Sequence, residues 1–521
     1  MNRSLSLARV QEESLWDIIV IGGGATGLGI AVDAAKRGFK VLLLEKNDFA
    51  KGTSSRSTKL VHGGVRYLAQ GNIKLVMEAL RERGYLLKNA PHLTRVQQFI
   101  IPAYSQWQKW FYGIGLFAYD LLSGKLSLGR PGILSKKGVL NRMPSTASSG
   151  LKGGIMYTDG QFDDARLAIA LAQTATDFGG VLINYMSVTN LLKDTTGKVS
   201  GVQAFDELEE KEYTFHSKAV VNATGVFVDQ VLALDDPSNM AMVMPSQGVH
   251  LVVDRSFFPG TAALMIPKTT DGRVLFALPW HHEVVIGTTD TALNMIDEDP
   301  VALDEEVEFI ISNFNQYSSK QISKKDVKTV FAGLRPLVKS SNAGKTSLAS
   351  RDHTIMVSKS SLVTITGGKW TTYRKMAKDA VNNAAFVAKL PIVKCATRNL
   401  RLHGFSEGIS YGDRLSSYGS DAETIRAYVT EQPSLGEKMH PDFEYIMAEV
   451  LWSVKEEMAM TVDDILSRRT RMLFLDAKAA ISSAPKVARL MADALGKDDT
   501  WIQEQLADFN DIAETYLVRQ P

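Results

Sequence analysis

The hydrophobic positions at the start of the chain form first a strand pattern and then a helix pattern. Residues 17–21 are a short, β-branched apolar run of the kind found in buried parallel strands. Apolar residues then recur at helical spacing from 28 to 35, and Gly38 is placed to end that helix. A second apolar run follows at residues 40–45. The pattern therefore predicts a strand, a turn, a helix and a second, parallel strand.

Later segments extend this picture. Residues 218–229 and residues 361–381 each contain an apolar strand that runs into a glycine-containing turn. Strand-like runs are also frequent within residues 241–345. From about residue 396 onward the spacing of apolar positions becomes helical. These patterns predict an α/β protein that ends in a helical region.

Composition narrows the class of protein without identifying it. The chain has 521 residues, of which 45% are hydrophobic, and this is enough for two or three domains with large cores. Its 59 basic and 57 acidic side chains nearly cancel, so net charge gives no case for nucleic-acid binding. Cys395 is the only cysteine, which excludes internal disulfides and CxxC sites. Residues 1–16 lack the apolar stretch of a signal peptide, and no run of 18 apolar residues predicts a membrane span.

The turn after the first strand has the spacing of a dinucleotide-binding site. Gly22, Gly24 and Gly27 form G-x-G-x-x-G, and the second strand ends in Glu45. The first glycine permits a tight turn, the second lets a pyrophosphate approach the backbone, and the third lets the helix pack closely on the strand. The N–H groups at the helix start attract the phosphates. We expect Glu45 to accept hydrogen bonds from the adenosine ribose and to disfavour the 2′-phosphate of NADP.

The fingerprint alone does not separate FAD from NAD, but two later turns favour FAD. The turn at Thr224 and Gly225 resembles the strand end that returns beside the dinucleotide in flavoproteins. The turn at Gly367 and Gly368 opens a second helix, whose N-terminus could stabilise negative charge on a reduced flavin ring.

The polar segment after Glu45 predicts contacts along the cofactor. We expect its hydroxyl groups to bond the pyrophosphate and the ribityl chain, and the candidates are Ser54, Ser55, Ser57 and Thr58. His62, Gly63 and Gly64 would then lie flat against the isoalloxazine ring, where bulkier side chains would clash. Arg66 and Tyr67 would face the substrate. The alternative is an ordinary solvated loop rich in serine.

Eight motifs in a fixed order carry a resemblance to a known family. In the sequence they read TSSRSTKLVHGGVRYL, DGQFDDARL, NATG, GVH, PWHHEVVIGTTD, GLRPL, SRDHT and TGGKWTTYRK. The chain is identified by them as similar to FAD-dependent glycerol-3-phosphate dehydrogenase, a membrane-associated respiratory enzyme, from about residue 16 to 390. The resemblance implies an α/β fold, with a Rossmann-like FAD domain of the glutathione-reductase or D-amino-acid-oxidase type, a mixed-sheet substrate cap and a C-terminal helical domain.

The resemblance also implies an activity and a set of site residues. The reaction is oxidation of sn-glycerol 3-phosphate to dihydroxyacetone phosphate by hydride transfer to flavin N5, with electrons passed to membrane quinone. The implied site residues are Arg66, Tyr67, His250, Arg335, Arg351 and Lys369. The sequence lacks an EF-hand pattern, which favours a bacterial form on the cytoplasmic face of the membrane over a mitochondrial one.

The chemistry needs residues of these types, although each has another interpretation. A dianionic phosphate is matched by guanidinium groups such as Arg335 and Arg351, which could instead be structural. His250 is the candidate base, because the ordinary pKa of histidine suits proton abstraction near neutrality, and His62 is its rival. Lys369 could bind the cofactor and stabilise the reduced flavin or the developing alkoxide, or it could be a solvated surface lysine.

No metal site is predicted. His281 and His282 are adjacent, so on a strand they point to opposite faces, and no third ligand follows at a suitable spacing. Cys395 lies beyond the flavin motifs, which argues against covalent attachment of a flavin.

We expect three domains, two of them discontinuous. They are an FAD-binding domain (1–90, 151–240 and 346–395), a substrate-binding cap (91–150 and 241–345) and a C-terminal α-helical domain (396–521). Residues 105–137 combine many aromatic side chains with an excess of lysine and arginine, which is typical of helices that lie at a lipid surface. The alternative is that these aromatic residues build the cap core or the contact of a homodimer.

Three functions remain open at this level. The favoured one is a quinone-linked, FAD-dependent dehydrogenase on the membrane surface. A close rival is a glycerol-3-phosphate oxidase that passes electrons to O₂ and releases H₂O₂. A third is a non-catalytic flavin-binding interaction module.

Overall fold

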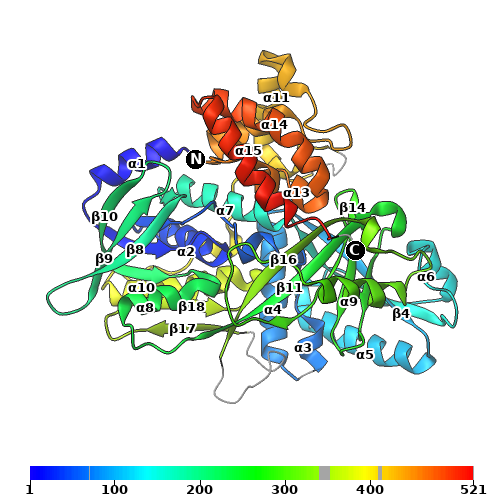
Figure 1. Cartoon of the computed structure of the whole chain (residues 1–521). Helices are drawn as coiled ribbons and strands as arrows, with labels where there is room; N and C mark the ends of the chain where they lie inside the picture. The colour runs from blue at the N-terminus through cyan, green and yellow to red at the C-terminus, as the bar shows by residue number, and fades with distance from the viewer. Residues whose placement is uncertain (70, 340–351, 409–412, 520–521) are drawn as a thin grey trace.

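Two β-sheets form the body of the molecule, and a helical region packs across one end of it (Figure 1). The computed structural model describes residues 1–521 except 70, 340–351, 409–412 and 520–521. The first sheet contains both strands of the predicted N-terminal unit, and the second contains most of the central strands. This arrangement confirms the predicted α/β class with mixed sheets and a helical C-terminal part.

The first sheet is parallel at its centre, as the continuous apolar runs predict. Strand β1 (Trp16–Ile21) pairs in parallel with β2 (Val41–Leu44) on one side and with β10 (Lys211–Asn222) on the other. The full order is β17-β18-β10-β1-β2-β7, and β8 and β9 extend β10 as an antiparallel ribbon. The remaining strands are β7 (Val181–Ile183), β8 (Met186–Lys193), β9 (Val199–Asp206), β17 (His353–Val357) and β18 (Val363–Gly367).

Three helices cover this sheet, and glycine lets two of them approach closely. Helix α2 (Ala25–Lys36) packs between α7 (Asp164–Asp177) and α10 (Tyr373–Val387). A Cβ atom on Gly29 of α2 would lie 2.8 Å from the ring of Tyr373. The apolar faces of these helices and of the central strands form one buried core, which accounts for the helical spacing seen between residues 28 and 35.

The second sheet has the order β15-β11-β14-β13-β12-β4-β6-β3, with β16 paired to β11 and β5 paired to β6. The long antiparallel pair of β11 (Val243–Asp254) and β16 (Val327–Val338) places Ser246 opposite Arg335. The other strands are β3 (Leu60–Val61), β4 (Thr94–Ala103), β5 (Gly132–Leu134), β6 (Gly153–Phe162), β12 (Ala263–Ile266), β13 (Leu275–Trp280), β14 (Glu283–Gly287) and β15 (Thr291–Ala292).

The membership of the sheets bears on the expected domains. Strands β3 and β6 pair in the second sheet, although their residues belong to segments expected in the FAD-binding domain. Strand β6 is long enough to pair with β3, β4 and β5. These backbone hydrogen bonds place it in the second sheet, and sequence patterns do not reveal them. The domain boundaries themselves stay a prediction.

The C-terminal helical region is anchored to the body by buried charges. Arg469 Nη1 and Nη2 donate to the two carboxylate oxygens of Asp48 at 2.7 and 2.9 Å. Arg471 Nη2 donates to the carbonyl oxygen of Ser55 at 2.7 Å, and Arg166 makes two hydrogen bonds of 2.7 Å with Glu457. Each charge is buried together with its partner, which offsets the cost of removing it from water. The contacts of Asp48 and Ser55 attach the loop between β2 and β3 to the C-terminal region, and the contact of Arg166 attaches α7 to the same region.

The helices of this region pack on one another and on the second sheet. A single apolar cluster contains Phe331 of β16, Phe474 and other buried apolar residues of the C-terminal helices. The helices are α11 (Ala422–Glu431), α12 (Met447–Glu456), α13 (Met472–Leu475), α14 (Ala477–Leu495) and α15 (Asp499–Glu514).

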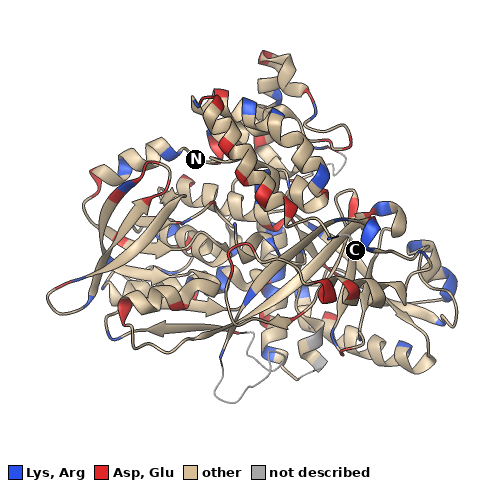
Figure 2. Ribbon diagram, viewed as in Figure 1, with Lys and Arg blue, Asp and Glu red and all other residues tan. Residues whose placement is uncertain are grey.

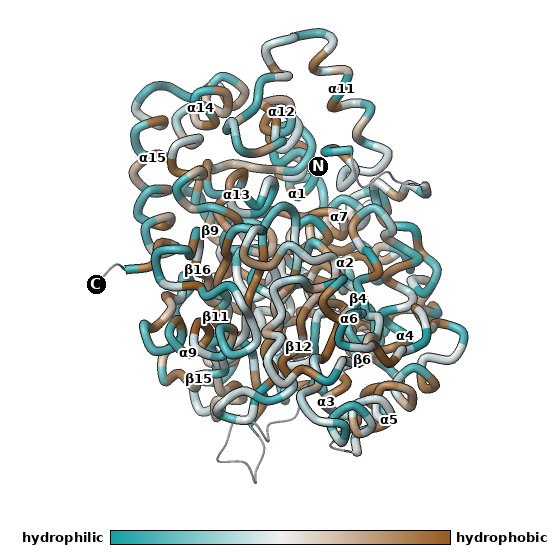
Figure 3. Tube along the Cα trace, turned by 90° about the vertical axis from the view of Figure 1, so that its right-hand side faces the viewer, coloured by the Kyte–Doolittle hydropathy of each residue, from teal (hydrophilic) through white to brown (hydrophobic). Residues whose placement is uncertain are grey.

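Helix α5 (Gln106–Ser123) differs from the other helices because much of its apolar surface is exposed. Its side chains at Trp107, Trp110, Ile114 and Leu121 are 74, 61, 68 and 81% exposed. The helix lies at the edge of the body, carries few charges (Figure 2) and contains many hydrophobic residues (Figure 3). Within the part of the chain that the structure describes, no helix is both long and apolar enough to cross a membrane.

Six further α-helices occur among the described residues. They are α1 (Arg3–Glu12), α3 (Val65–Ala69), α4 (Ile73–Asn89), α6 (Lys136–Arg142), α8 (Val228–Asp235) and α9 (Asp304–Asn315).

Candidate active site

The glycine turn has the local geometry that the fingerprint requires. Gly22 has a φ of +108°, and a Cβ atom there would lie 2.8 Å from the carbonyl oxygen of Ala223. A Cβ atom on Gly27 would lie 1.8 Å from the carbonyl oxygen of Gly22. Helix α2 starts directly after Gly24, so its free N–H groups point out of the turn. The turn therefore lets a ligand come close to its backbone, and its N–H groups can bind an anion.

Some N–H groups of this turn already donate hydrogen bonds to side chains of the protein. Ser54 Oγ accepts a hydrogen bond from the Ala25 N–H at 2.9 Å. Glu45 accepts from the N–H groups of Gly23 and Asn47 at 2.5 and 2.9 Å. Burial raises the pKa of Glu45, and the nearby Asp48 and Glu298 carboxylates act in the same direction. The carboxylate therefore sits at the end of β2, where an adenosine ribose would meet it.

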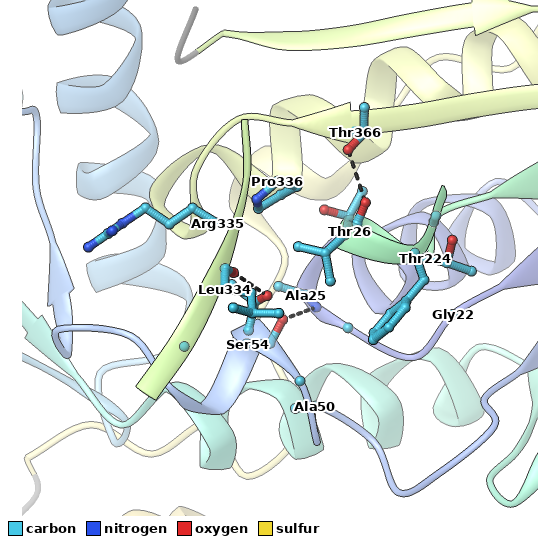
Figure 4. Close-up of a pocket in the computed structure, with 18 of the residues that line it drawn as sticks. Gly22, Ala25, Thr26, Ala50, Ser54, Thr224, Leu334, Arg335, Pro336 and Thr366 are labelled. Atoms are coloured by element: carbon cyan, nitrogen blue, oxygen red, sulfur yellow. Dashed lines mark hydrogen bonds between the residues drawn. The ribbon is translucent and has the colours of Figure 1, made fainter. Parts of the chain in front are cut away.

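A cavity of about 450 Å³ runs from this turn toward the second sheet. Figure 4 shows Ala25 and Thr26 at the start of α2 on one side of it, with Arg335 extending away from them on the other. The predicted residues that line it are Gly22, Gly24, Glu45, Ser54, Ser57, Thr58, His62, Thr224, Gly225, His250, Arg335, Gly367, Gly368 and Lys369. The structure therefore brings together residues from five separate segments of the chain.

A second, smaller cavity of about 200 Å³ adjoins the first. Thr58, Leu60, His62 and Arg335 line both cavities. The predicted residues Gly64 and Tyr67 line only the smaller one, together with Asp159, Arg273, Thr288, Thr289 and Asp290. The shared wall divides a cofactor-sized space from a compact space lined by both polar and apolar side chains.

His250 is buried at the wall of the larger cavity. Its side chain is stacked on Phe331 at 4.8 Å between ring centroids, and its Nε2 lies 2.9 Å from Thr58 Oγ1. Burial lowers the pKa of His250 well below 6.5, and the cations of Lys59 and Arg335 lower it further. The expectation that this imidazole titrates near neutrality is therefore wrong, since sequence shows neither burial nor neighbouring cations. His250 is therefore neutral near pH 7, and the same surroundings make it a weaker base than an exposed histidine.

His62 is also neutral. Burial lowers its pKa to about 4, and the Lys369 cation contributes to the decrease. Its backbone N–H donates to Thr371 Oγ1 at 3.2 Å. Unlike His250, His62 reaches both cavities. The structure thus keeps both candidate bases in the form that accepts protons.

Arg335 is held rigidly at the junction of the cavities. Its Nη2 donates to Thr288 Oγ1 and to the Thr289 carbonyl oxygen, each at 3.0 Å, and its Nη1 donates to the Gln247 carbonyl oxygen at 3.2 Å. A Cβ atom on Gly248 would lie 2.3 Å from Nη2, so the guanidinium needs a glycine beside it. The planar group is therefore fixed before any ligand arrives.

Lys369 lines the larger cavity only. It follows the Gly367-Gly368 turn, and its Nζ is 3.9 Å from the centre of the Tyr67 ring. A Cβ atom on Gly64 would lie 3.1 Å from the same Nζ. Lysine and tyrosine thus meet over a turn that has no room for a side chain.

Several predicted residues do not line either cavity. Gly27 supports helix packing, and Ser55 is buried with its carbonyl oxygen bonded to Lys59 and Arg471. Gly63 is buried behind His62 and is described below. Arg351 lies outside the described residues, and so does the side chain of Arg66.

Other residues at the site were missed by the sequence patterns. Arg273 lines the smaller cavity from the turn before β13, and Asp159 lines it from β6. Asp159 belongs to the motif DGQFDDARL, but the spacing of the residues in this motif does not indicate a cavity. Arg273 follows an ordinary polar turn, which gives no signal of function.

Comparison with known proteins gives a consistent picture. Residues 17–374 match the family described as FAD dependent oxidoreductase, and residues 363–502 match the family described as C-terminal domain of alpha-glycerophosphate oxidase. The chain is 40% identical to the mitochondrial glycerol-3-phosphate dehydrogenase of Homo sapiens, over 97% of this chain and 74% of that protein. It is 36% identical to the mitochondrial enzyme of Schizosaccharomyces pombe, over 96% of this chain and 87% of that one.

A solved structure is similar over the whole length. The glycerol-3-phosphate dehydrogenase from Bacillus halodurans, complexed with FAD, superimposes with a TM-score of 0.81 at 31% identity. The match covers 100% of this chain and 99% of that one. Because the larger cavity also has the glycine turn and terminal carboxylate that such a cofactor needs, FAD is the cofactor of this chain.

Proposed function

The chain belongs to the FAD-dependent glycerol-3-phosphate dehydrogenases, and we propose that it oxidises sn-glycerol 3-phosphate to dihydroxyacetone phosphate and passes the electrons to a membrane quinone. The observation that carries this proposal is the junction of the two cavities. A cofactor-sized space with a dinucleotide turn meets a compact space, lined by both polar and apolar side chains, at Thr58, His62 and Arg335. A small anionic substrate in the compact space would lie beside the reactive end of the cofactor.

The cofactor would be held along the larger cavity by the predicted residues that line it. Backbone N–H groups of the turn at Gly22 and Gly24 would bind the pyrophosphate, and Glu45 would bind the adenosine ribose. His62 and the turn at Gly64 would lie beside the isoalloxazine ring. FAD, when bound, supplies the two-electron acceptor that takes the C2 hydride at flavin N5.

The protein supplies charge and position for the substrate. The guanidinium of Arg335, whose Nη atoms already donate to oxygens of Gln247, Thr288 and Thr289, would attract the phosphate by its charge, and we propose that Arg66 and Arg351 contribute hydrogen bonds as well. Tyr67 would pack against the glycerol carbons. Lys369, in the wall of the larger cavity, would stabilise the negative charge that develops on the substrate oxygen.

His250 is the proposed base for the substrate hydroxyl. It is neutral, and Thr58, which lines both cavities, lies within hydrogen-bond distance of its Nε2. The Thr58 hydroxyl can therefore lie between His250 and a substrate in the smaller cavity. His62 remains the rival, because it reaches the smaller cavity directly.

The electron acceptor is tested by mixing the substrate-reduced enzyme with air-saturated buffer or with a ubiquinone or menaquinone analogue. We expect reoxidation by a quinone analogue to be faster at matched acceptor concentration. Faster reoxidation by O₂, with release of H₂O₂, would identify an oxidase instead. That second candidate is favoured by the match of residues 363–502 to a domain named after the oxidase. If no reduction by substrate occurs, the flavin-binding module is the remaining alternative.

We propose that residues 105–137, and α5 in particular, contact a lipid surface. Its exposed aromatic residues would lie at the depth of the headgroups, while Lys109, Lys125 and Arg130 would face anionic lipid. Replacing Trp107, Trp110 and Phe111 with serine should prevent flotation with anionic vesicles and slow quinone reduction, with dye-linked activity retained.

A matched control uses exposed apolar residues elsewhere on the surface. Leu5, Met240 and Met295 are 67, 89 and 83% exposed, and their replacement with serine should leave flotation unchanged. Because aromatic insertion is not screened by salt, binding of the parent should weaken but persist at high ionic strength. A parent protein that does not float, or a triple variant that unfolds, would assign these aromatic residues to a protein contact such as a homodimer. Peripheral attachment to the cytoplasmic face of a bacterial membrane stays part of this proposal.

A further inference from the structure

One side chain of α5 points inward and contacts the turn proposed to lie against the flavin. Tyr119 is only 2% exposed, although its helix carries six large apolar residues that are about half exposed or more. Its Oη accepts a hydrogen bond from the Gly63 N–H at 2.7 Å. The same Oη donates to Asp159 Oδ2 at 2.8 Å. The exposed helix and the His62–Gly64 turn are thus joined by one phenol group.

The carboxylate that accepts the hydrogen bond of the phenol is itself held in place. Arg83 of α4 donates through Nη1 to Asp159 Oδ1 at 2.8 Å. Through Nη2 the same guanidinium donates to Ser123 Oγ and to the Leu126 carbonyl oxygen, each at 3.3 Å. These groups lie at and just beyond the C-terminal end of α5. The phenol therefore belongs to a buried network that ties α5 to α4 and to strand β6.

The phenol also limits where the turn can lie. A Cβ atom on Gly63 would be 2.6 Å from Tyr119 Oη and 2.5 Å from Leu80 Cδ2. The backbone of the turn therefore packs directly on these two side chains. Burial and the Asp159 carboxylate raise the pKa of Tyr119 well above 10, so the phenol keeps its proton and can donate. Asp159, His62 and Gly64 all line the smaller cavity, so a shift of this network reaches the substrate space.

We propose that Tyr119 is a positioning residue, which fixes the His62–Gly64 turn against the flavin ring and connects the lipid-facing helix α5 to the active site. This inference rests on the proposed function, because that function places the flavin beside the turn and lipid beside α5. When α5 settles into a lipid surface, a displacement of the helix moves the phenol, and the Gly63 backbone follows because it has no other acceptor in this network.

The positioning role is tested with Tyr119→Phe in the FAD-bound enzyme. Phenylalanine keeps the ring but removes the acceptor for the Gly63 N–H and the donor to Asp159, so the turn relaxes away from the ring. We expect the anaerobic rate of flavin reduction by glycerol 3-phosphate to fall roughly fivefold, which is the effect of losing about one hydrogen bond. We also expect the visible absorption bands of the flavin and its reduction potential to shift.

The matched control is Tyr112→Phe on the same helix. The Tyr112 ring packs edge-on against Phe111 at 5.4 Å and is half-buried against the apolar cluster that contains Leu60, and the change removes only its hydroxyl group. This variant should leave the flavin spectrum, the reduction potential and the reduction rate unchanged. If Tyr119→Phe also leaves all three unchanged, Tyr119 only fills space and the proposal is wrong. If Tyr119→Phe does not fold, 3-fluorotyrosine at position 119 keeps the ring and changes the hydrogen-bonding strength of the phenol, with the same expected shifts.

A second arm tests the connection to the lipid surface. Addition of anionic vesicles to the parent should shift its flavin spectrum and change its rate of reduction by substrate. Tyr119→Phe, whose outer helix face is intact, should float with vesicles as the parent does but show no such flavin response. A response equal to that of the parent would overturn the connection. If the parent itself does not float, the lipid contact fails, while the flavin measurements without vesicles still decide the positioning role.

Discussion

The larger cavity has two ends, which we propose to hold the adenosine and to face the substrate, and these two ends are built in different ways. At the adenosine end, Gly22, Gly24, Gly27 and Glu45 lie within one strand–turn–helix–strand unit, and each has its role by its place in that unit. At the substrate end, Thr58, His250, Arg335 and Lys369 come from distant segments that meet through the second sheet and a turn after β18. No two of these four residues are near neighbours in sequence.

This difference has consequences for how each end responds to substitution. The adenosine end relies on backbone groups and on the absence of side chains, so one added side chain blocks it. The substrate end relies on separate side chains, each held by its own neighbours, so a substitution there removes one contribution and leaves the others. The comparison therefore predicts all-or-none effects at one end and graded effects at the other.

The largest effect is expected from Gly24→Val at the adenosine end. Gly24 has an ordinary φ of −79°, and a Cβ atom there meets only Ser54 Oγ, at 3.1 Å, so the protein itself should tolerate the change. The branched side chain would occupy the approach path of the pyrophosphate. We expect a folded but colourless protein, checked by circular dichroism and by the absorbance of flavin released on denaturation. Gly115→Ala, at an open position on α5, is the control that should stay yellow. A yellow Gly24→Val protein would remove the contrast between the two ends.

The next largest effect is expected from His250→Asn at the substrate end. The variant should keep its FAD but show a fall of about 10²-fold or more in the anaerobic rate of flavin reduction, as for loss of a general base. The residual rate should rise with pH as hydroxide replaces the base. Stopped-flow reduction of this variant and of His62→Asn, measured side by side, separates the two histidines. Normal kinetics in His250→Asn would move the role to His62 or to no side chain.

A somewhat smaller effect is expected from Arg335→Lys. The charge remains, but the planar group that Gln247, Thr288 and Thr289 hold in one place is lost, so kcat/KM should fall by about 10²-fold, or roughly 2.7 kcal/mol of transition-state binding. Glycerol, which lacks the phosphate, should be a poor substrate of the parent. Lys328→Arg lies on the same strand, where it pairs with Glu283 at 2.7 Å, and should be kinetically silent. If Arg335→Lys is equally silent, Arg335 is structural.

The smallest effect concerns pH and is absent at neutrality. The pKa of His62 is lowered to about 4 in the folded protein, against about 6.5 in the unfolded chain. Between these values the unfolded state binds more protons, so stability rises with pH through this window and is lost as pH falls through it. We expect His62→Asn to reduce this slope in FAD-free protein by up to about 1.4 kcal/mol per pH unit, measured by urea unfolding at several pH values. His216→Asn, at an exposed position, should leave the slope unchanged.

Much of the adenosine end could be predicted because its information is local. The spacing of glycines, the helical recurrence of apolar residues and the carboxylate at the second strand end all act within about thirty residues, and all appear in the structure as expected. The helical character of the C-terminal region was predictable for the same reason, since periodicity is a property of each helix by itself. By contrast, the family resemblance, and not any local pattern, indicated Arg335 and Lys369.

The other features of the site depend on which segments become neighbours, so only the tertiary structure determines them. The pairing of β11 with β16 helps to bury His250 against Phe331, and the cations of Lys59 and Arg335 act on it as well. These surroundings together make its imidazole neutral, and no sequence pattern reveals their combined electrostatic effect. The same holds for Arg273 and Asp159, which reach the smaller cavity from unrelated turns and strands. The aromatic pattern of α5 is plain in the sequence, but only packing shows that Tyr119 points inward to Gly63 while other aromatic residues of the same helix, such as Trp110 and Phe111, are exposed. Local spacing determines which element forms and which residues share a face, whereas burial and the proximity of charges arise only when the elements pack together.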